Sequence, residues 1–140
     1  MSKVAVVFWS GSGNTEAMAN AVVAGAKAKG AEVTLFGAVE FSAENPADYD
    51  GIAFGCPAMG AEQLEESEFQ PMWDEVKAEL AGKKVGLFGS YAWASGEWMD
   101  TWKADAEGVG ITLSAAPVIC NSAPDDNALK ECEALGAALA

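Results

Sequence analysis

The clearest chemical signal in the sequence is a polar loop at residues 10–15, which reads Ser-Gly-Ser-Gly-Asn-Thr and follows an apolar run. Its glycines permit a tight turn, its hydroxyl and amide groups can donate hydrogen bonds, and a helix that begins here would present unpaired backbone N–H groups. A loop of this kind can bind an anion such as a phosphate group without a charged side chain. The same residues also suit a turn that only caps a helix, and the loop alone leaves both interpretations open.

Two better-known phosphate-binding motifs are absent from the sequence. Glu16 stands where the dinucleotide-binding pattern GxGxxG carries its last glycine. No GK[ST] sequence of a nucleotide-binding P-loop occurs, since Lys83 and Lys84 follow Gly82 and lead into a predicted strand. The loop at 10–15 is therefore an anion site of another type, if it binds an anion at all.

Two further loops carry side chains that could contact a bound molecule. Residues 56–62 read Cys-Pro-Ala-Met-Gly-Ala-Glu and precede a glutamate-rich stretch at 64–69, and residues 90–98 place tyrosine and tryptophan beside a flexible turn. Met59 would fill a core position equally well, and the glutamates would suit a solvated face or a helix N-terminus. A loop tryptophan either covers the core or stacks on a flat aromatic ligand, and a neighbouring anion site favours the ligand.

The elements that must position these loops alternate between strands and helices. Short apolar runs occur at residues 4–9, 33–36, 52–56, 85–89 and 111–119. The first, third and fourth are continuously apolar, as in strands buried on both faces of a parallel sheet. Apolar residues between the runs recur at helical spacing: Met18, Ala21, Val22 and Gly25; Phe69, Met72, Trp73, Val76 and Leu80; Trp98 and Trp102; Leu129, Cys132 and Leu135. We also expect a helix within residues 37–49, where the pattern is polar and weakly periodic.

This alternation predicts a single α/β domain over residues 1–140, with a doubly wound five-stranded parallel sheet of order 2-1-3-4-5 and helices on both faces. In that order the winding reverses between the first and third strands, and ligands bind at such a reversal. The loops at 10–15 and 57–62 should therefore line a binding crevice, with the loop at 90–96 beside them.

Charge excludes several classes of function. The chain has 21 acidic and 8 basic residues, a net charge of −13, and neither histidine nor arginine. Histidine bases, histidine metal ligands and arginine clamps are therefore excluded. Nucleic-acid binding is not expected, because a phosphate backbone requires a basic surface, whereas a protein partner with a basic face fits the charge.

Cysteine use and hydropathy indicate the compartment. Cys56, Cys120 and Cys132 form no CxxC pair, which argues against a zinc site and a disulfide framework and suits a reducing environment. No apolar run approaches the ~20 residues of a membrane span, and the first run is too short for a signal peptide. We expect a cytoplasmic protein without metal or membrane association, in which Cys56 is a buried structural thiol.

Taken together, the three loops resemble those of the short-chain flavodoxins of anaerobic bacteria. The shared motifs are Ser-Gly-Ser-Gly-Asn-Thr at 10–15, Met-Gly-x-Glu at 59–62 with Leu-Glu-Glu-Ser-Glu-Phe at 64–69, and Phe-Gly-Ser-Tyr-x-Trp at 88–93. They occur in order over essentially the whole chain, without the long insertion of the long-chain class. The resemblance implies FMN as the cofactor and electron transfer, not catalysis, as the function.

The resemblance also implies which residues hold FMN. Residues 10–15 would hold its phosphate, Met59 and Trp93 would flank the isoalloxazine ring, and Glu62 would accept a hydrogen bond from flavin N3. Backbone N–H groups at 92–94 would meet flavin O2, and Ser90 and Asn121 would approach the ribityl chain. The expected site comprises Ser10, Gly11, Ser12, Gly13, Asn14, Thr15, Pro57, Ala58, Met59, Gly60, Ala61, Glu62, Ser90, Tyr91, Ala92, Trp93, Ala94, Gly96 and Asn121.

The function implied by the resemblance is that of a low-potential one-electron carrier that shuttles between semiquinone and hydroquinone. In the family, the peptide at the position of Gly60–Ala61 turns its carbonyl toward flavin N5 on reduction, and Ala61 stands where an acidic or polar residue is usual. The expected partners are ferredoxin-type donors and acceptors with basic docking faces, and the expected state is a monomer.

Other functions on the same fold make different demands on the sequence. A flavin-dependent NAD(P)H reductase would need a second, usually basic nucleotide subsite, for which the chain offers lysines only. A response regulator would need an acidic cluster at the strand ends, where the chain has Trp9-Ser10 and Gly55-Cys56. A flavin storage or sensory module stays open, and electron delivery to a partner would distinguish a carrier from it.

Overall fold

A parallel five-stranded sheet in the order β2-β1-β3-β4-β5 organises the part of the chain that the structure describes. The computed structural model describes residues 2–11, 13–59, 64–92 and 96–140. The strands are β1 (Lys3–Phe8), β2 (Glu32–Gly37), β3 (Gly51–Gly55), β4 (Lys84–Tyr91) and β5 (Val118–Asn121). The order is the one predicted from the alternation of apolar runs and helical patterns.

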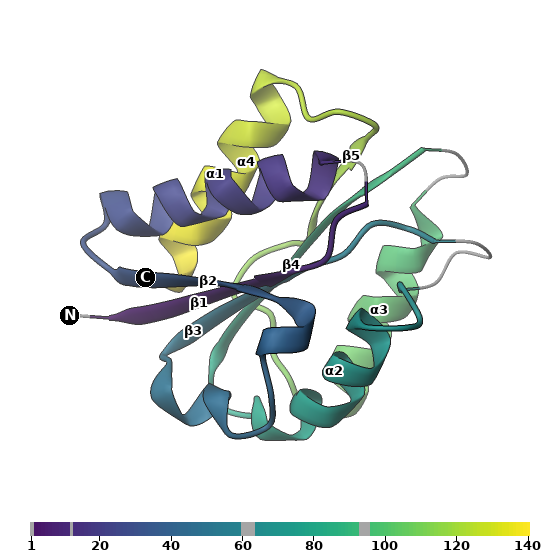
Figure 1. Ribbon diagram of the computed structural model, residues 1–140. Helices are drawn as coiled ribbons and strands as arrows, with labels where there is room; N and C mark the ends of the chain where they lie inside the picture. The colour runs from purple at the N-terminus through teal and green to yellow at the C-terminus, as the bar shows by residue number, and fades with distance from the viewer. Residues whose placement is uncertain (1, 12, 60–63, 93–95) are drawn as a thin grey trace.

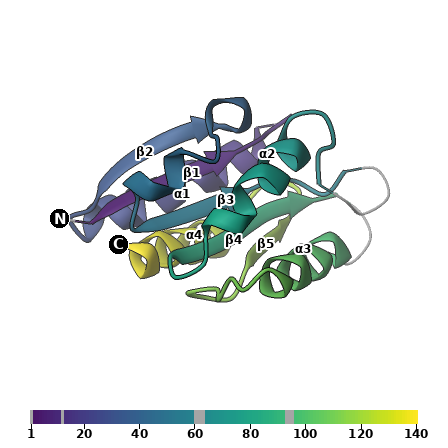
Figure 2. The same cartoon turned by 90° about the horizontal axis from the view of Figure 1, so that it is seen from below.

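The helices cover both faces of this sheet, as predicted. They are α1 (Asn14–Ala28), α2 (Phe69–Val76), α3 (Glu97–Gly108) and α4 (Asp126–Leu139). Figure 1 shows α1 and α4 together above the sheet and α2 and α3 below it. Figure 2, which views the molecule from the α2–α3 side, shows α2 in front of the strands and α3 nearer to β5.

The core consists of two apolar layers, one on each face of the sheet. One layer packs Ile52, Phe54 and Leu87 against α2 and α3, including Trp73 and Trp102. The other packs Val4, Val6 and Phe88 against α1 and α4. Strands β1, β3 and β4 supply side chains to both layers, which explains why their sequences are continuously apolar.

The prediction of a helix within residues 37–49 is wrong. These residues form two short 3-10 helices, η1 (Ala38–Glu40) and η2 (Asn45–Asp48). The Asn45 side chain accepts hydrogen bonds from the backbone N–H and the hydroxyl of Ser42, at 2.8 and 3.1 Å. Pro46, which follows, has no N–H to donate and disfavours helical backbone at Asn45. Local side-chain bonds therefore replace an α-helical turn.

Two further elements are shorter than predicted. The strand expected at 111–119 is β5, which begins only at Val118, directly after Pro117, a residue that cannot donate to the ladder. Before it, Leu113 makes an isolated bridge with Val85. The helix expected through Leu80 leaves α-helical geometry after Val76 and continues as the 3-10 helix η3 (Lys77–Glu79). No helix in the described ranges is long and apolar enough to cross a membrane.

Candidate functional site

The carboxyl ends of β1, β3 and β4 meet at one edge of the sheet, and backbone hydrogen bonds continue beyond the strands. The Trp9 N–H donates to the Gly55 carbonyl at 3.0 Å, and the Ala58 N–H donates to the Ser90 carbonyl at 2.9 Å. These bonds bring together the starts of the three predicted loops. A cavity of about 240 Å³ lies between them. Its lining residues are Trp9, Gly11, Asn14, Pro57, Ala58, Met59, Ser90, Tyr91, Ala92 and Ser122.

The first loop forms a turn that leads into α1. Gly13 adopts a left-handed conformation, with φ of 94°, which favours glycine. The Ser10 hydroxyl oxygen accepts hydrogen bonds from the N–H groups of Gly13 and Glu16, at 3.0 and 3.3 Å. Ser10 therefore organises the turn, and the N–H groups of Asn14 and Thr15 lie in the first turn of α1, where a helix supplies no internal acceptor. Capping and anion binding, the two interpretations of this loop, are compatible.

Thr15 and Ser90 join the first loop to β4. Their hydroxyl oxygens are 3.0 Å apart, and the two side chains are 1% and 4% exposed. Ser90 also lines the cavity, so this buried hydrogen bond sets the distance between α1 and the end of β4. Gly89, just before it, leaves no room for a side chain, because a Cβ there would lie 2.2 Å from the Cys56 carbonyl oxygen.

The second loop is held on both sides of residues 60–63. Before them, Pro57, Ala58 and Met59 line the cavity. After them, the N–H of Glu65 donates to the Cys56 sulfur at 3.3 Å. Cys56 is fully buried, as expected, and burial raises the pKa of its thiol to about 12. This cysteine is a structural anchor at neutral pH and not a nucleophile.

Glu65 lies at a helix N-terminus, one of the two settings that the sequence suggested, but it is buried and not solvated. The side chain is 6% exposed, and its carboxylate accepts hydrogen bonds from the N–H groups of Glu68 and Phe69, at 2.7 and 2.9 Å. It also accepts from the N–H of Ser67 at 3.0 Å and from the Ser67 hydroxyl. Burial by itself would raise the pKa of this carboxyl, but these donors outweigh burial and hold the pKa below its usual value.

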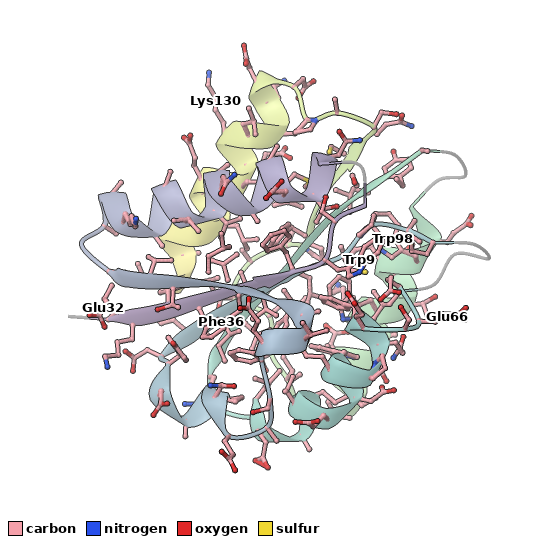
Figure 3. All side chains as sticks on the ribbon, viewed as in Figure 1. Trp9, Glu32, Phe36, Glu66, Trp98 and Lys130 are labelled. Carbon is pink, nitrogen blue, oxygen red and sulfur yellow. The ribbon has the colours of Figure 1, made fainter. Side chains whose placement is uncertain are left out.

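Trp9 connects the end of the first strand to the glutamate-rich stretch at 64–69. It was not among the site residues predicted from the sequence. Its indole N–H donates to the Glu68 carboxylate at 3.0 Å, and its ring lines the cavity. Figure 3 shows Trp9 among the strand ends and Glu66 at the outer surface. The position of Trp9 directly after a buried strand, at the same edge as the loops, was the signal that could have found it.

The fourth contribution comes from the end of β5. Ser122, also absent from the predicted set, lines the cavity with φ of 60°, and its N–H donates to the Tyr91 carbonyl at 2.7 Å. Asn121 is exposed at the end of β5 and accepts a hydrogen bond from the Ser122 hydroxyl at 3.1 Å. Nothing local in the sequence marks Ser122, because its place depends on pairing with Tyr91.

The third loop leaves β4 and re-enters the described chain at α3. The Tyr91 ring packs on Trp98 with centroids 5.6 Å apart, and Gly96 is the buried N-cap of α3. Six predicted site residues lie outside the described residues: Ser12, Gly60, Ala61, Glu62, Trp93 and Ala94. Within the described ranges, no group of three or more potential ligands could hold a metal ion.

The donor set fits a phosphorylated, partly aromatic molecule. Backbone N–H groups and hydroxyls at the start of α1 suit a phosphate, and the apolar walls from Trp9, Met59 and Tyr91 suit a flat ring. The described cavity contains no cationic side chain that would hold the phosphate by charge. Recognition would therefore rest on hydrogen bonds and the helix dipole.

Comparisons with known proteins find similarity over nearly the whole chain. The family described as Flavodoxin matches residues 6–136. A flavodoxin of Megasphaera elsdenii is 47% identical over 98% of both chains, and one of Clostridium beijerinckii is 38% identical over 96% of this chain and 97% of its own.

Solved structures show the same likeness. A solution structure of two-electron reduced Megasphaera elsdenii flavodoxin matches with a TM-score of 0.90 and 49% identity over 97% of both chains. Oxidised flavodoxin 1 of Bacillus cereus matches with a TM-score of 0.86 and 26% identity over 99% of this chain and 97% of its own.

Proposed function

Since the chain belongs to the flavodoxin family of FMN-containing electron carriers, we propose that it carries single electrons at low potential between redox proteins. The observation that supports the proposal is the convergence of three loops on one cavity that offers hydrogen-bond donors for a phosphate and apolar walls for a ring. FMN, when bound, supplies the one-electron chemistry, and the protein sets where and at what potential it occurs.

We assign the phosphate of FMN to the start of α1. Ser10 and Thr15 are engaged in protein hydrogen bonds that hold the turn and fix it to β4. The backbone N–H groups of Asn14 and Thr15 and the Asn14 side chain are then the groups available for the phosphate, together with the predicted Ser12. Met59 and the predicted Trp93 flank the ring, and the predicted Glu62 accepts from flavin N3.

The low potential follows from charge. The second electron adds negative charge to a cofactor held by a chain of net charge −13 without arginine. Neighbouring carboxylates therefore oppose this electron and lower the potential of its couple. The same field would steer partners with basic docking faces, such as ferredoxin-type donors and acceptors.

The cellular setting is part of the same proposal. All three cysteines, Cys56, Cys120 and Cys132, are unpaired thiols, which suits a reducing cytoplasm. We propose that the protein works there as a monomer.

The decisive experiment measures FMN and its potentials. The purified protein should release about one FMN per chain, as expected for one site, and spectroelectrochemical titration should resolve two one-electron steps, the second well below the first. Transfer of electrons to a basic redox partner should slow as salt is added. A colourless protein that cannot take up FMN would overturn the proposal, and steady NAD(P)H oxidation by the protein alone would contradict the carrier role.

A further inference from the structure

Glu65 is a buried carboxylate for which the FMN site described above has no direct use. Its two oxygens receive four donations: Oε1 from the N–H groups of Glu68 and Phe69, and Oε2 from the N–H and hydroxyl of Ser67. A carboxylate is the only side-chain group that can accept on both oxygens in this way without donating. Glu65 thus closes the segment 65–69 onto itself at the start of α2.

This closed segment is fastened to two strand ends that border the cavity. The N–H of Glu65 donates to the buried sulfur of Cys56, which directly follows β3. Glu68 donates its N–H to the Glu65 carboxylate. The Glu68 carboxylate in turn accepts a hydrogen bond from the indole N–H of Trp9, which follows β1. The two strands that end just before Trp9 and Cys56, β1 and β3, are paired in parallel. Glu65 therefore lies at the centre of the contacts that fix the chain immediately after residue 63.

We propose that Glu65 is a positioning residue for FMN: by fastening residues 65–69 to Cys56 and Trp9, it fixes the chain that follows the second loop and thereby sets both FMN affinity and the balance between oxidised and reduced FMN. This inference rests on the proposed function. Glu65 acts through the loop and does not itself touch the cofactor.

The exchange Glu65→Gln tests this at nearly constant shape. A glutamine amide keeps one accepting oxygen but turns an NH₂ group toward one of the two pairs of donors, so half of the contacts are lost. Two controls match it. Glu66→Gln removes the same charge from an exposed neighbour. Asp50→Asn alters a carboxylate that accepts a backbone N–H, that of Lys3 at 2.9 Å, at the opposite edge of the sheet.

The expected result is a selective loss of FMN binding. Because hydrogen bonds to a charged group are lost, Glu65→Gln should raise the dissociation constant of the complex between FMN and the apoprotein by about tenfold. It should also shift the midpoint potential of the first one-electron couple. Glu66→Gln and Asp50→Asn should change the dissociation constant by less than about twofold and leave that midpoint in place.

A purely structural role predicts a different pattern. Loss of hydrogen bonds at the start of α2 would lower the free energy of unfolding of the apoprotein, yet an apoprotein that stays folded would bind FMN as before. Parent-like FMN affinity and potentials in Glu65→Gln would therefore overturn the proposal, whatever the stability. If Glu65→Gln does not fold, Ser67→Ala removes a single donor and should shift affinity in the same direction by a smaller factor, and no shift would overturn the proposal. Failure of the parent to bind FMN would instead overturn the proposed function.

Discussion

The hydroxyl groups of Thr15 and Ser90 share a buried hydrogen bond of 3.0 Å that ties the first turn of α1 to the end of β4. The two residues are 75 positions apart in the chain. The bond links the side of the site assigned to phosphate to the side that carries the aromatic third loop, so the separation of the two halves depends on it.

Ser90→Ala should destabilise the apoprotein by about 1–3 kcal/mol, because it leaves the Thr15 hydroxyl buried without its partner. Urea unfolding measures the loss, and FMN affinity should fall as well. Thr15→Val with Ser90→Ala removes both hydroxyls and should cost less than the sum of the single changes. Strict additivity in this double-mutant cycle would show that the bond contributes nothing.

Trp98→Ala should destabilise the fold by about 3–5 kcal/mol, as large-to-small exchanges of buried aromatic residues do. Trp98 is 1% exposed, and its indole N–H donates to the Cys56 carbonyl at 3.2 Å. Trp93→Ala, at the residue predicted to stack on the flavin, should instead weaken FMN binding by well over about tenfold with little loss of apoprotein stability. Unfolding and FMN titrations of both variants check this, and equal effects on FMN affinity would refute the assignment of the stacking residue.

Gly136→Ala should destabilise the protein by about 1–3 kcal/mol or more through overpacking. Helices α1 and α4 approach so closely that a Cβ at Gly136 would lie 2.0 Å from the Val22 carbonyl oxygen. Gly108 in α3 is the matched control, because a Cβ there would meet nothing within 4 Å. Gly108→Ala should be neutral or stabilising by up to about 1 kcal/mol. Thermal unfolding compares the two, and a tolerated Gly136→Ala would mean that the helices can separate without cost.

The stability of the apoprotein should decline in acid partly because of Glu65. Its pKa is lower in the folded protein than the ordinary value, since donors from Ser67, Phe69 and Glu68 outweigh burial. Such a group adds stability that is present above its unfolded pKa and is lost as pH falls through its folded pKa. Between pH of about 5 and 3, the unfolding free energy of Glu65→Gln should therefore fall less steeply than that of the parent. Asp105, whose pKa is also lowered, should cause part of the loss of stability in both proteins. If the free energy of unfolding fell equally steeply with pH in the parent and in Glu65→Gln, the role of Glu65 would be contradicted.

Salt should raise the potential of the second one-electron couple more than that of the first. A carboxylate ~11 Å from the flavin, at an effective dielectric of ~40, opposes a new negative charge by roughly 0.75 kcal/mol, on the order of 30 mV. Screening weakens this effect as the Debye length shrinks from ~10 Å at 0.1 M to ~3 Å at 1 M. Equal movement of both couples with salt, or none of the second, would show that carboxylate repulsion does not set the low potential.

Glu66→Gln should modestly raise the midpoint potential of the second one-electron couple, even when no salt is added. Glu65, in the same glutamate-rich stretch, is unsuitable for this test, because its exchange would also disrupt the hydrogen bonds that its carboxylate accepts. Glu32→Gln is the control, since Figure 3 places Glu32 and Glu66 at opposite ends of the sheet. Redox titration should show a shift in Glu66→Gln and none in Glu32→Gln.

Patterns within short stretches of the sequence determined the architecture and the location of the site. Continuous apolar runs identified β1, β3 and β4, because a strand buried on both faces has no polar position. The alternation of strands and helices then determined the order of the sheet, and the order placed three loops at one edge. The turn at residues 10–15 could be predicted from its glycines and hydroxyl groups for the same reason, because its geometry depends on residues that are adjacent in the chain.

Only the tertiary structure decided the contacts between residues far apart in the chain. Trp9 meets Glu68, and Ser122 enters the cavity through its bond to Tyr91, because strands β1, β3, β4 and β5 end side by side. Glu65 looked like one of several surface glutamates, and its burial depends on how the chain after residue 63 packs on Cys56. A single sequence shows which polar side chains a protein has. The hydrogen-bond partner of each buried polar group depends on packing, and packing is a property of the whole fold.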